Sequence, residues 1–260
     1  HMNDILDMIE EHECRVGPKG KVLMPAFLSE AEIKIGTSTY SMGIGGLHST
    51  EERVRHLADE IFSLFDVDVA SYYPNIILTL GLYPKQLGPA FLKVYRSIVT
   101  RRLAAKDKAK ALKKEMEALE AQIAQANRPS ELMTARLGEL KDEWHTENVA
   151  NEGGKIMING SFGKLGSVYS ALFSPDLLLT VTLTGQLSLL MLIERLVRAG
   201  IAVVSGNTDG IVIKARKDQI DLMRSIVKKW EKDTAFETEE AEYSGLFAAS
   251  VNNYIALKKG

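Results

Sequence analysis

Hydrophobic and polar positions alternate along residues 61–69, IFSLFDVDV, where apolar residues are separated by Asp66 and Asp68. A period of two predicts a strand with both carboxylates on one face. Like charges this close repel, so the pair requires either a compensating cation or full exposure to water. A solvated edge strand would provide exposure, but the segment ASYYPNI that follows at once is unusual for a plain edge.

From residue 89 the apolar spacing changes to threes and fours, along 91–103, 112–123 and 133–144, with the Pro-containing break ANRPSE at 126–131. Two such stripes on either side of a break predict an antiparallel helical hairpin. At 1.5 Å per residue, its first arm would reach roughly 50 Å. We therefore expect a projecting element rather than a compact bundle.

The C-terminal half combines helices with strands. Ser174 and Pro175 predict the N-cap and first residue of a long apolar helix that Gly200 ends. The segment 201–215, IAVVSGNTDGIVIKA, has two β-branched runs around a turn and predicts a β-hairpin with Asp209 in its turn. An amphipathic helix at 217–232 and final strands at 236–243 and 252–258 follow.

The N-terminal part, residues 1–60, has a mixed pattern with a plausible short helix at 4–13. Gly45 and Gly46 form either a plain turn or a place where the backbone closely approaches another group. Together these elements predict an α+β fold, a small antiparallel sheet backed by helices with an inserted antiparallel helical hairpin.

Composition narrows the class of protein. The chain has 260 residues, 45% hydrophobic, with a single cysteine, Cys14. One cysteine excludes an internal disulfide framework and a zinc site built on several cysteines. The apolar segment 177–193 contains six non-apolar positions, which favours a buried helix over a membrane span. We expect a cytoplasmic protein without membrane contact, whose start at His1-Met2 resembles a cloning remnant and suggests a fragment.

Charge is unevenly distributed although the whole chain carries only −2. Residues 93–114 contain nine lysines and arginines and one acid, Asp107, a net of +8. A solvated charged helix accounts for most of these lysines. The concentration of positive charge near the acidic strand instead favours a polyanionic ligand.

Three features point to one chemistry: Asp68 at a strand end, Asp209 in a hairpin turn, and basic residues on helices. Carboxylates that hold two divalent cations about 3.5–4 Å apart stabilise attacking and leaving oxygens in phosphoryl transfer. Helical cations can neutralise a triphosphate. The glycine-rich segment 153–166 lacks the GxxxxGK[ST] pattern, so a Walker A site is excluded.

With these residues in view, the sequence resembles family B DNA polymerases. The segment DVASYYPN at 68–75 is similar to the family's motif A, DxxSLYPS, and KIMINGSFG at 155–163 is similar to motif B, KxxxNSxYG. SGNTDG at 205–210 is similar to motif C, YGDTDS, with Asn207 at the first Asp. VTRRLAAK at 99–106 is similar to the fingers pattern RxxxK. The match spans about residues 40 to 257. The segments GIGGLHS and NTDG resemble phage or plasmid members of the family.

The resemblance implies a palm interrupted by fingers. Residues 1–88 would form the N-terminal part of the palm with motif A, 89–163 the fingers hairpin with motif B, and 164–260 the rest of the palm with motif C. A proofreading exonuclease and a full thumb are not expected. The segment NNYIAL is similar to the family's KxY region, except that Asn252 replaces the lysine.

The resemblance also implies roles for single residues. The catalytic residues and metal ligands would be Asp68 and Asp209, with the Val69 carbonyl, around two Mg2+ ions that Mn2+ can replace. Nucleotide binding is expected from Arg102, Lys106, Lys155 and Asn159, backbone amides near Ser71 and Tyr72, and Tyr73 as the sugar selector. The nascent base pair would face Phe162 and Gly163. DNA contacts are expected from Gly45, Gly46, Thr208 and Tyr254.

The implied activity is template-directed DNA synthesis, with dNTPs, primer–template DNA and further polymerase domains or replication proteins as partners. The alternatives are a palm and fingers fragment that binds DNA without efficient turnover, a structural coiled-coil protein, and an RNA-synthesising palm, against which the bulky Tyr73 argues. For single residues, the alternatives are core aromatics at 72 and 73, a helix cap at Asn159 and a surface lysine at 155. Asp66 is taken as a neighbour rather than a third ligand, and Asn207→Asp is expected to be tolerated.

Overall fold

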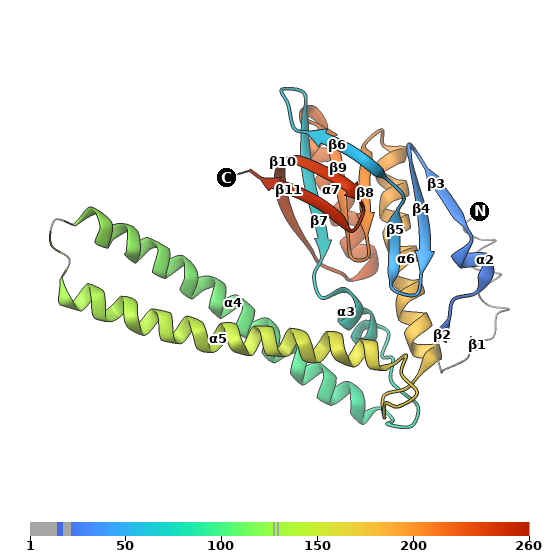
Figure 1. Ribbon diagram of the computed structural model, residues 1–260, viewed down its shortest axis with the longest axis horizontal. Coiled ribbons are helices and arrows are strands. Elements are labelled where there is room, and N and C mark those ends of the chain that lie inside the picture. Colours follow the sequence, from blue (N-terminus) through green and yellow to red (C-terminus); the bar gives the residue numbers. More distant parts are fainter. Residues whose placement is uncertain (1–14, 18–21, 127, 129, 260) are drawn as a thin grey trace. The chain divides into compact units, whose positions relative to one another are not determined.

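The computed structural model describes residues 15–17, 22–126, 128 and 130–259. The helix expected at 4–13 lies outside these residues. The chain forms two compact units, one from residues 1–82 and 165–260 and the other from residues 83–164. The functional division into 1–88, 89–163 and 164–260 stays a prediction. The first unit is an α+β domain with an antiparallel sheet and helices, as the sequence predicts (Figure 1).

The sheet of the first unit has nine strands in the order β11-β10-β7-β9-β8-β5-β4-β3, with β6 also paired to β10. It is larger than the small sheet that the sequence predicts, because four strands before residue 60 join it. The strands are β3 (Glu32–Ile35), β4 (Ser38–Gly43), β5 (Gly46–Ser49), β6 (Glu52–Leu57), β7 (Phe62–Val69), β8 (Ala202–Asn207), β9 (Gly210–Arg216), β10 (Thr238–Ser250) and β11 (Asn253–Lys258). A separate pair joins β1 (Arg15–Val16) to β2 (Val22–Leu23).

Strand β7 carries the alternating pattern and lies inside the sheet, between β10 and β9. Phe65, Val67 and Val69 are at most 4% exposed, so one face of the strand belongs to the core. Asp66 and Asp68 lie on the other face. The predicted strand is confirmed, and the alternative of a solvated edge strand is wrong.

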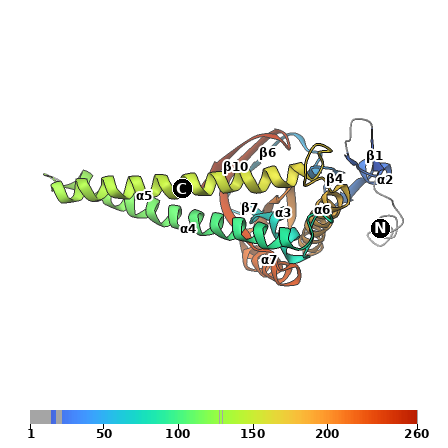
Figure 2. The same cartoon turned by 90° about the horizontal axis from the view of Figure 1, so that it is seen from below.

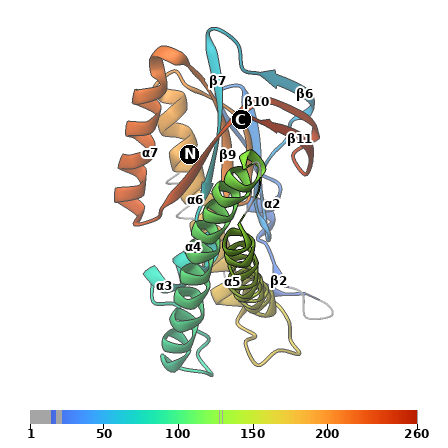
Figure 3. The ribbon, with the colours of Figure 1, turned by 90° about the vertical axis from the view of Figure 1, so that its left-hand side faces the viewer.

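Helices α6 (Pro175–Arg198) and α7 (Ile220–Thr234) lie side by side on one face of this sheet (Figure 3). The indole N–H of the fully buried Trp230 on α7 donates to the Ser188 carbonyl of α6 at 2.8 Å. Ser174 precedes α6 as predicted, but its side chain makes no capping hydrogen bond. The shorter helices are α2 (Ala26–Ser29), α3 (Tyr72–Thr79) and the 3-10 turn η2 (Lys217–Gln219).

Helix α6 is long and apolar enough to cross a membrane by length and composition. However, 67% of its most apolar 18-residue window is buried inside the fold. Val181, Leu189 and Ile193 are fully buried. This is the packing of a core helix, in agreement with the interpretation of residues 177–193.

The second unit is a helical hairpin of α4 (Ala90–Gln125) and α5 (Glu131–Lys164), which run side by side (Figure 2). The 36 residues of α4 extend about 54 Å at 1.5 Å per residue. Buried alanines at 105 and 109 let the helices approach closely. Cross-helix ion pairs join Lys108 to Glu147, Arg136 to Glu115 and Lys141 to Glu120 at 2.7–3.1 Å. The predicted antiparallel hairpin is confirmed, and the motif B segment is its last helical stretch.

Candidate active site

Two aspartates come together because strand β7 pairs with the β8–β9 hairpin. Asp68 lies opposite Gly210 in the β7–β9 ladder, and the Val69 N–H donates to the carbonyl oxygen of Asp209 at 2.7 Å. A Cβ on Gly210 would lie 1.9 Å from Asp68 Oδ1, so glycine leaves the room that this carboxylate occupies. Positions 68 and 209, which are 141 residues apart in the sequence, thus share one end of the sheet.

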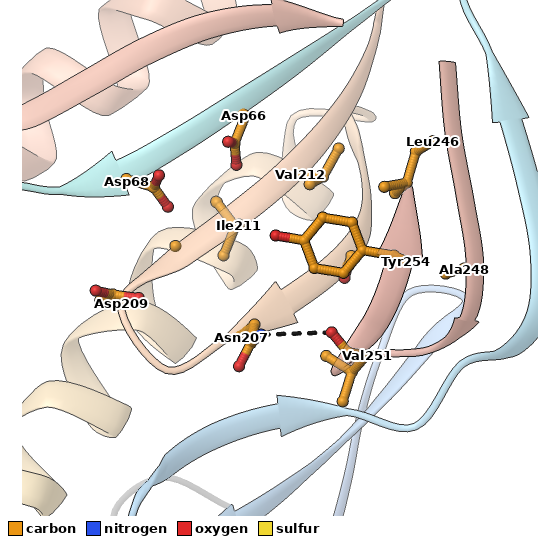
Figure 4. Close-up of a pocket in the computed structure, with 12 residues that line it drawn as sticks. Asp66, Asp68, Asn207, Asp209, Ile211, Val212, Leu246, Ala248, Val251 and Tyr254 are labelled. Atoms are coloured by element: carbon orange, nitrogen blue, oxygen red, sulfur yellow. Dashed lines mark hydrogen bonds between the residues drawn. The ribbon is translucent and has the colours of Figure 1, made fainter. Parts of the chain in front are cut away.

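Both aspartates line a pocket of about 180 Å³ within the first unit (Figure 4). Asp66, on the same face of β7, is a third acidic residue in its wall. The Tyr243 hydroxyl donates to Asp66 Oδ2 and fixes that carboxylate against the core. The remaining lining residues are Ser205, Asn207, Gly210, Ile211, Val212, Leu246, Ala248, Val251 and Tyr254.

Partial burial raises the proton affinity of two carboxylates in this pocket. The pKa of Asp68 is raised to about 7, first by partial burial of its carboxylate and then by the negative charges of Asp66, Asp209 and Glu239. The residue as a whole is exposed, because the pocket is open to water. Burial also raises the pKa of Asp66, and Lys258 opposes both shifts. A cation in the pocket would relieve this repulsion.

Asp68 and Asp209 are two carboxylates of this pocket that could together hold a metal ion. Within the described part of the chain, no group of three or more histidine, cysteine, aspartate or glutamate side chains is arranged to hold a metal ion. Mg2+ is usually bound by one or two carboxylates together with waters and substrate phosphates. Asp68 and Asp209 provide such a pair of hard oxygen ligands. The Val69 carbonyl as a further ligand stays a prediction.

The turn that carries Asp209 is fixed to strand β5. The Thr208 N–H donates to the Leu47 carbonyl at 2.7 Å, and Thr208 has a left-handed backbone with φ of 54°. The buried Ser49 hydroxyl accepts from the Gly206 N–H at 2.7 Å and donates to the Gly206 carbonyl at 3.1 Å. These bonds leave the acidic turn little freedom to move away from β7.

Tyr73 lies between two glycine-containing segments. Its hydroxyl donates to the Gly45 carbonyl at 2.6 Å, and a Cβ on Gly185 of α6 would lie 3.2 Å from its ring. Gly46 has a φ of +147°, and a Cβ there would lie 3.0 Å from the Tyr73 oxygen. The β4–β5 segment is therefore a tight turn and also a close backbone approach, which joins the two interpretations of the glycine pair.

Tyr72 is a core aromatic, as one alternative has it. The side chain is 3% exposed, its hydroxyl donates to the Gly185 carbonyl at 2.6 Å, and its ring meets Phe236 edge to face at 5.2 Å. Burial raises its pKa. The buried side chain leaves only the backbone at this position for contact with a ligand. Ser71, with φ of 48°, occupies the N-cap position of α3, so the amides that follow it begin a helix.

The predicted triphosphate-binding residues lie in the second unit. Arg102 and Lys106 are one turn apart on α4 and half-buried, and Arg102 packs where Gly154 of α5 leaves space, since a Cβ there would lie 2.7 Å from Arg102 Cβ. Lys155 and Asn159 are one turn apart and exposed on α5. Asn159 is inside the helix, so the alternative of a helix cap is wrong. The half-buried Phe162 and exposed Gly163 lie near its end.

Two predicted DNA-contacting residues adjoin the acidic pocket. Tyr254 on β11 is 50% exposed and lines the pocket, and its pKa is raised by partial burial and then by Asp66, Asp68 and Asp209. Thr208 lies in the acidic turn and donates to Asn207 Oδ1 at 3.1 Å. The sequence interpretation missed Tyr243 as the partner of Asp66 and Asn207 as a donor. Alternation along β10 could have placed Tyr243 on the face of Asp66, but no local signal indicated the bond.

The first unit, with an acidic strand end paired to an acidic hairpin turn, has the architecture of a polymerase-like palm. Among solved structures, the chain is similar to the family B DNA polymerase from the hyperthermophilic archaeon Pyrobaculum calidifontis, with a TM-score of 0.52 and 19% sequence identity. The similarity covers 88% of this chain and 29% of that chain. No protein-family model and no curated protein matches the sequence. The chain therefore has a family B polymerase-like fold and spans less than a third of that polymerase.

Proposed function

We propose that the chain carries the palm and fingers of a DNA-directed DNA polymerase that adds deoxynucleotides to a primer 3′-hydroxyl. The observation that carries the proposal is the pairing of Asp68 with the hairpin that presents Asp209, in an acidic pocket of a family B polymerase-like fold. The pKa of Asp68, which is raised by partial burial and then by three neighbouring acids, supports a cation site there, because a positive charge would stabilise the ionised carboxylate.

In this proposal, Asp68 and Asp209 would hold two Mg2+ ions, with Mn2+ as an acceptable substitute, and the Val69 carbonyl would be a further ligand. Bound magnesium would supply the positive charge that stabilises the attacking and leaving oxygens. The primer 3′-hydroxyl would lose its proton to water as its oxygen attacks the α-phosphorus of the dNTP. The bond from the α-phosphorus to the oxygen that bridges to the β-phosphate would break, and pyrophosphate would leave. The hairpin bonds at Gly206 and Thr208 orient Asp209 for this step.

The remaining residues would bind the substrates. Tyr73 would exclude a 2′-hydroxyl, since its ring is fixed by the Gly45 carbonyl. The triphosphate would contact Arg102, Lys106, Lys155 and Asn159 and backbone amides at Ser71 and Tyr72. The nascent base pair would face Phe162 and Gly163, and DNA would contact Gly45, Gly46, Thr208 and Tyr254. We place this activity in the cytoplasm, with further polymerase domains or replication proteins as partners.

Primer extension across a magnesium titration tests the proposal. We expect Mg2+-dependent extension by the wild type, and a loss of several orders of magnitude in kcat for Asp68→Asn and for Asp209→Asn. Asp218→Asn is the matched control, because Asp218 is an exposed acid paired with Arg216 outside the pocket. Extension that survives either pocket substitution would refute the assignment. A gel shift on the same primer–template, without extension, would identify a binding fragment instead.

A further inference from the structure

The side-chain amide of Asn207 joins the acidic hairpin to the turn between β10 and β11. Asn207 is the last residue of β8, and its Nδ2 donates to the Val251 carbonyl at 3.3 Å (Figure 4). The same Nδ2 donates to Asn252 Oδ1 at 3.4 Å. Its Oδ1 accepts from the Thr208 hydroxyl at 3.1 Å. One side chain thus bridges two segments 44 residues apart.

The orientation of this amide is fixed by chemistry. The Val251 carbonyl can only accept a hydrogen bond, so the group that faces it must be the donating Nδ2. The amide oxygen then faces the Thr208 hydroxyl, from which it accepts a hydrogen bond. An aspartate would place a carboxylate oxygen, which cannot donate, against the Val251 carbonyl oxygen.

The bridged turn leads directly into the wall of the pocket. Val251 lines the pocket with Tyr254, and Tyr254 lies three residues further along the chain, on β11. Ser250 and Asn253 are paired across the turn, so the position of the turn sets where β11 begins. A displacement of the turn would therefore move Tyr254 relative to Asp209.

We propose that Asn207 is a positioning residue whose donor bonds hold the β10–β11 turn against the β8–β9 hairpin. Through this turn, the bonds also position Tyr254. This proposal rests on the proposed function because it takes primer–template DNA as the ligand that Tyr254 contacts. Asn207, which stands where motif C has its first aspartate, is then a required hydrogen-bond donor, and Asp209 is the acid of this turn. The proposal thus predicts that Asn207→Asp is harmful, whereas the sequence resemblance leads us to expect that it is tolerated.

The test compares Asn207→Ala and Asn207→Asp with Asn253→Asp, which adds the same charge on an exposed asparagine at the start of β11, next to the turn. Hydrogen exchange followed by mass spectrometry is measured on peptides that cover residues 250–254. Loss of the donor bonds should speed exchange there by roughly 2- to 10-fold in both Asn207 variants, the equivalent of about one net hydrogen bond. Unchanged exchange in Asn207→Ala would overturn the proposal.

Steady-state kinetics separate positioning from a general loss of folded enzyme. We expect the KM for primer–template to rise several-fold in the Asn207 variants, with kcat at saturating primer and the KM for dNTP close to wild type. A fall in kcat alone, or an Asn207→Asp enzyme that binds Mg2+ more tightly and extends faster, would overturn the proposal. A wild type that neither binds nor extends primer–template would refute the proposed function, while the exchange experiment would still decide whether the bridge exists.

Discussion

Substitution of Gly46 by alanine should test whether the β4–β5 turn both stabilises the fold and positions Tyr73. Gly46 has a φ of +147°, a backbone that costs a residue with a side chain about 1–3 kcal/mol. Its added Cβ would lie 2.9 Å from Thr208 Cγ2, 3.0 Å from Thr208 Cα and 3.0 Å from the Tyr73 oxygen. Overpacking of this kind costs a further 1–3 kcal/mol or so.

The summed effect is a destabilisation of about 2–6 kcal/mol. For a chain of this size, each kcal/mol lowers Tm by roughly 2–4 °C, so we expect a fall of about 10 °C in thermal melting. The same overlap displaces the acidic turn and Tyr73 together. The incorporation ratio of deoxynucleotide to ribonucleotide should therefore fall along with kcat.

Gly45→Ala is the matched control, because a Cβ at Gly45 would meet nothing within 4 Å and its carbonyl can still accept from Tyr73. We expect its Tm to stay within a few degrees of wild type. Equal melting temperatures for Gly46→Ala and Gly45→Ala would refute the packing argument. Normal sugar discrimination in a strongly destabilised Gly46→Ala would refute the link to Tyr73.

Three further substitutions probe the site. Tyr73→Ala should raise ribonucleotide incorporation while Tyr73→Phe, which keeps the ring, should not, and an equal ratio in both would exclude a steric selector. Gly154→Ala should displace Arg102 and raise the KM for dNTP. Gly153→Ala, whose added Cβ has no neighbour within 4 Å, should instead stabilise α5 by about 0.5–1 kcal/mol and leave this KM unchanged. A higher KM in Gly153→Ala than in Gly154→Ala would contradict the placement of Arg102. In EDTA, the stability that protonated Asp68 contributes should be lost as the pH rises from the pKa of its unfolded state, near 3.8, through its folded pKa of about 7. The melting temperatures at pH 5 and pH 8 should therefore differ less in Asp68→Asn than in the wild type. Adding Mg2+ should reduce the difference in the wild type.

Periodicity predicted the elements whose pattern is long or sharply alternating. The acidic strand, the 201–215 hairpin, the helical hairpin and helices α6 and α7 all carry such patterns, because each buries one defined face. Strands β3 to β6 were not predicted. Segments such as EIKI at 32–35 and ERVRHL at 52–57 are short and mixed in polarity, and they become strands through pairing with β4 and β10.

Tyr72 and Tyr73 are neighbours with the same side chain, yet they lie in different environments that no local sequence pattern distinguishes. Tyr72 points into the core toward Gly185, while Tyr73 points to the Gly45 carbonyl, and both contacts come from segments more than 25 residues away. Asn207 is similar, because its donor role depends on the Val251 carbonyl. Sequence resemblance supplied a chemical expectation at these positions, but the contacts depend on tertiary structure.

The hydrogen bonds around the acidic turn counteract the repulsion inside it. Partial burial of its carboxylate, and then the negative charges of Asp66, Asp209 and Glu239, raise the pKa of Asp68, so its ionised form is less favourable in the pocket than in water. The turn nevertheless remains against β7, because Gly206 and Thr208 are bonded to β5 and Asn207 is bonded to the β10–β11 turn. A flexible turn would relax away and lose its affinity for a cation. A fixed one keeps its negative charge concentrated, and that charge is neutralised when a cation enters. In the proposed function, the same set of bonds would therefore give the hairpin both its rigidity and its attraction for magnesium.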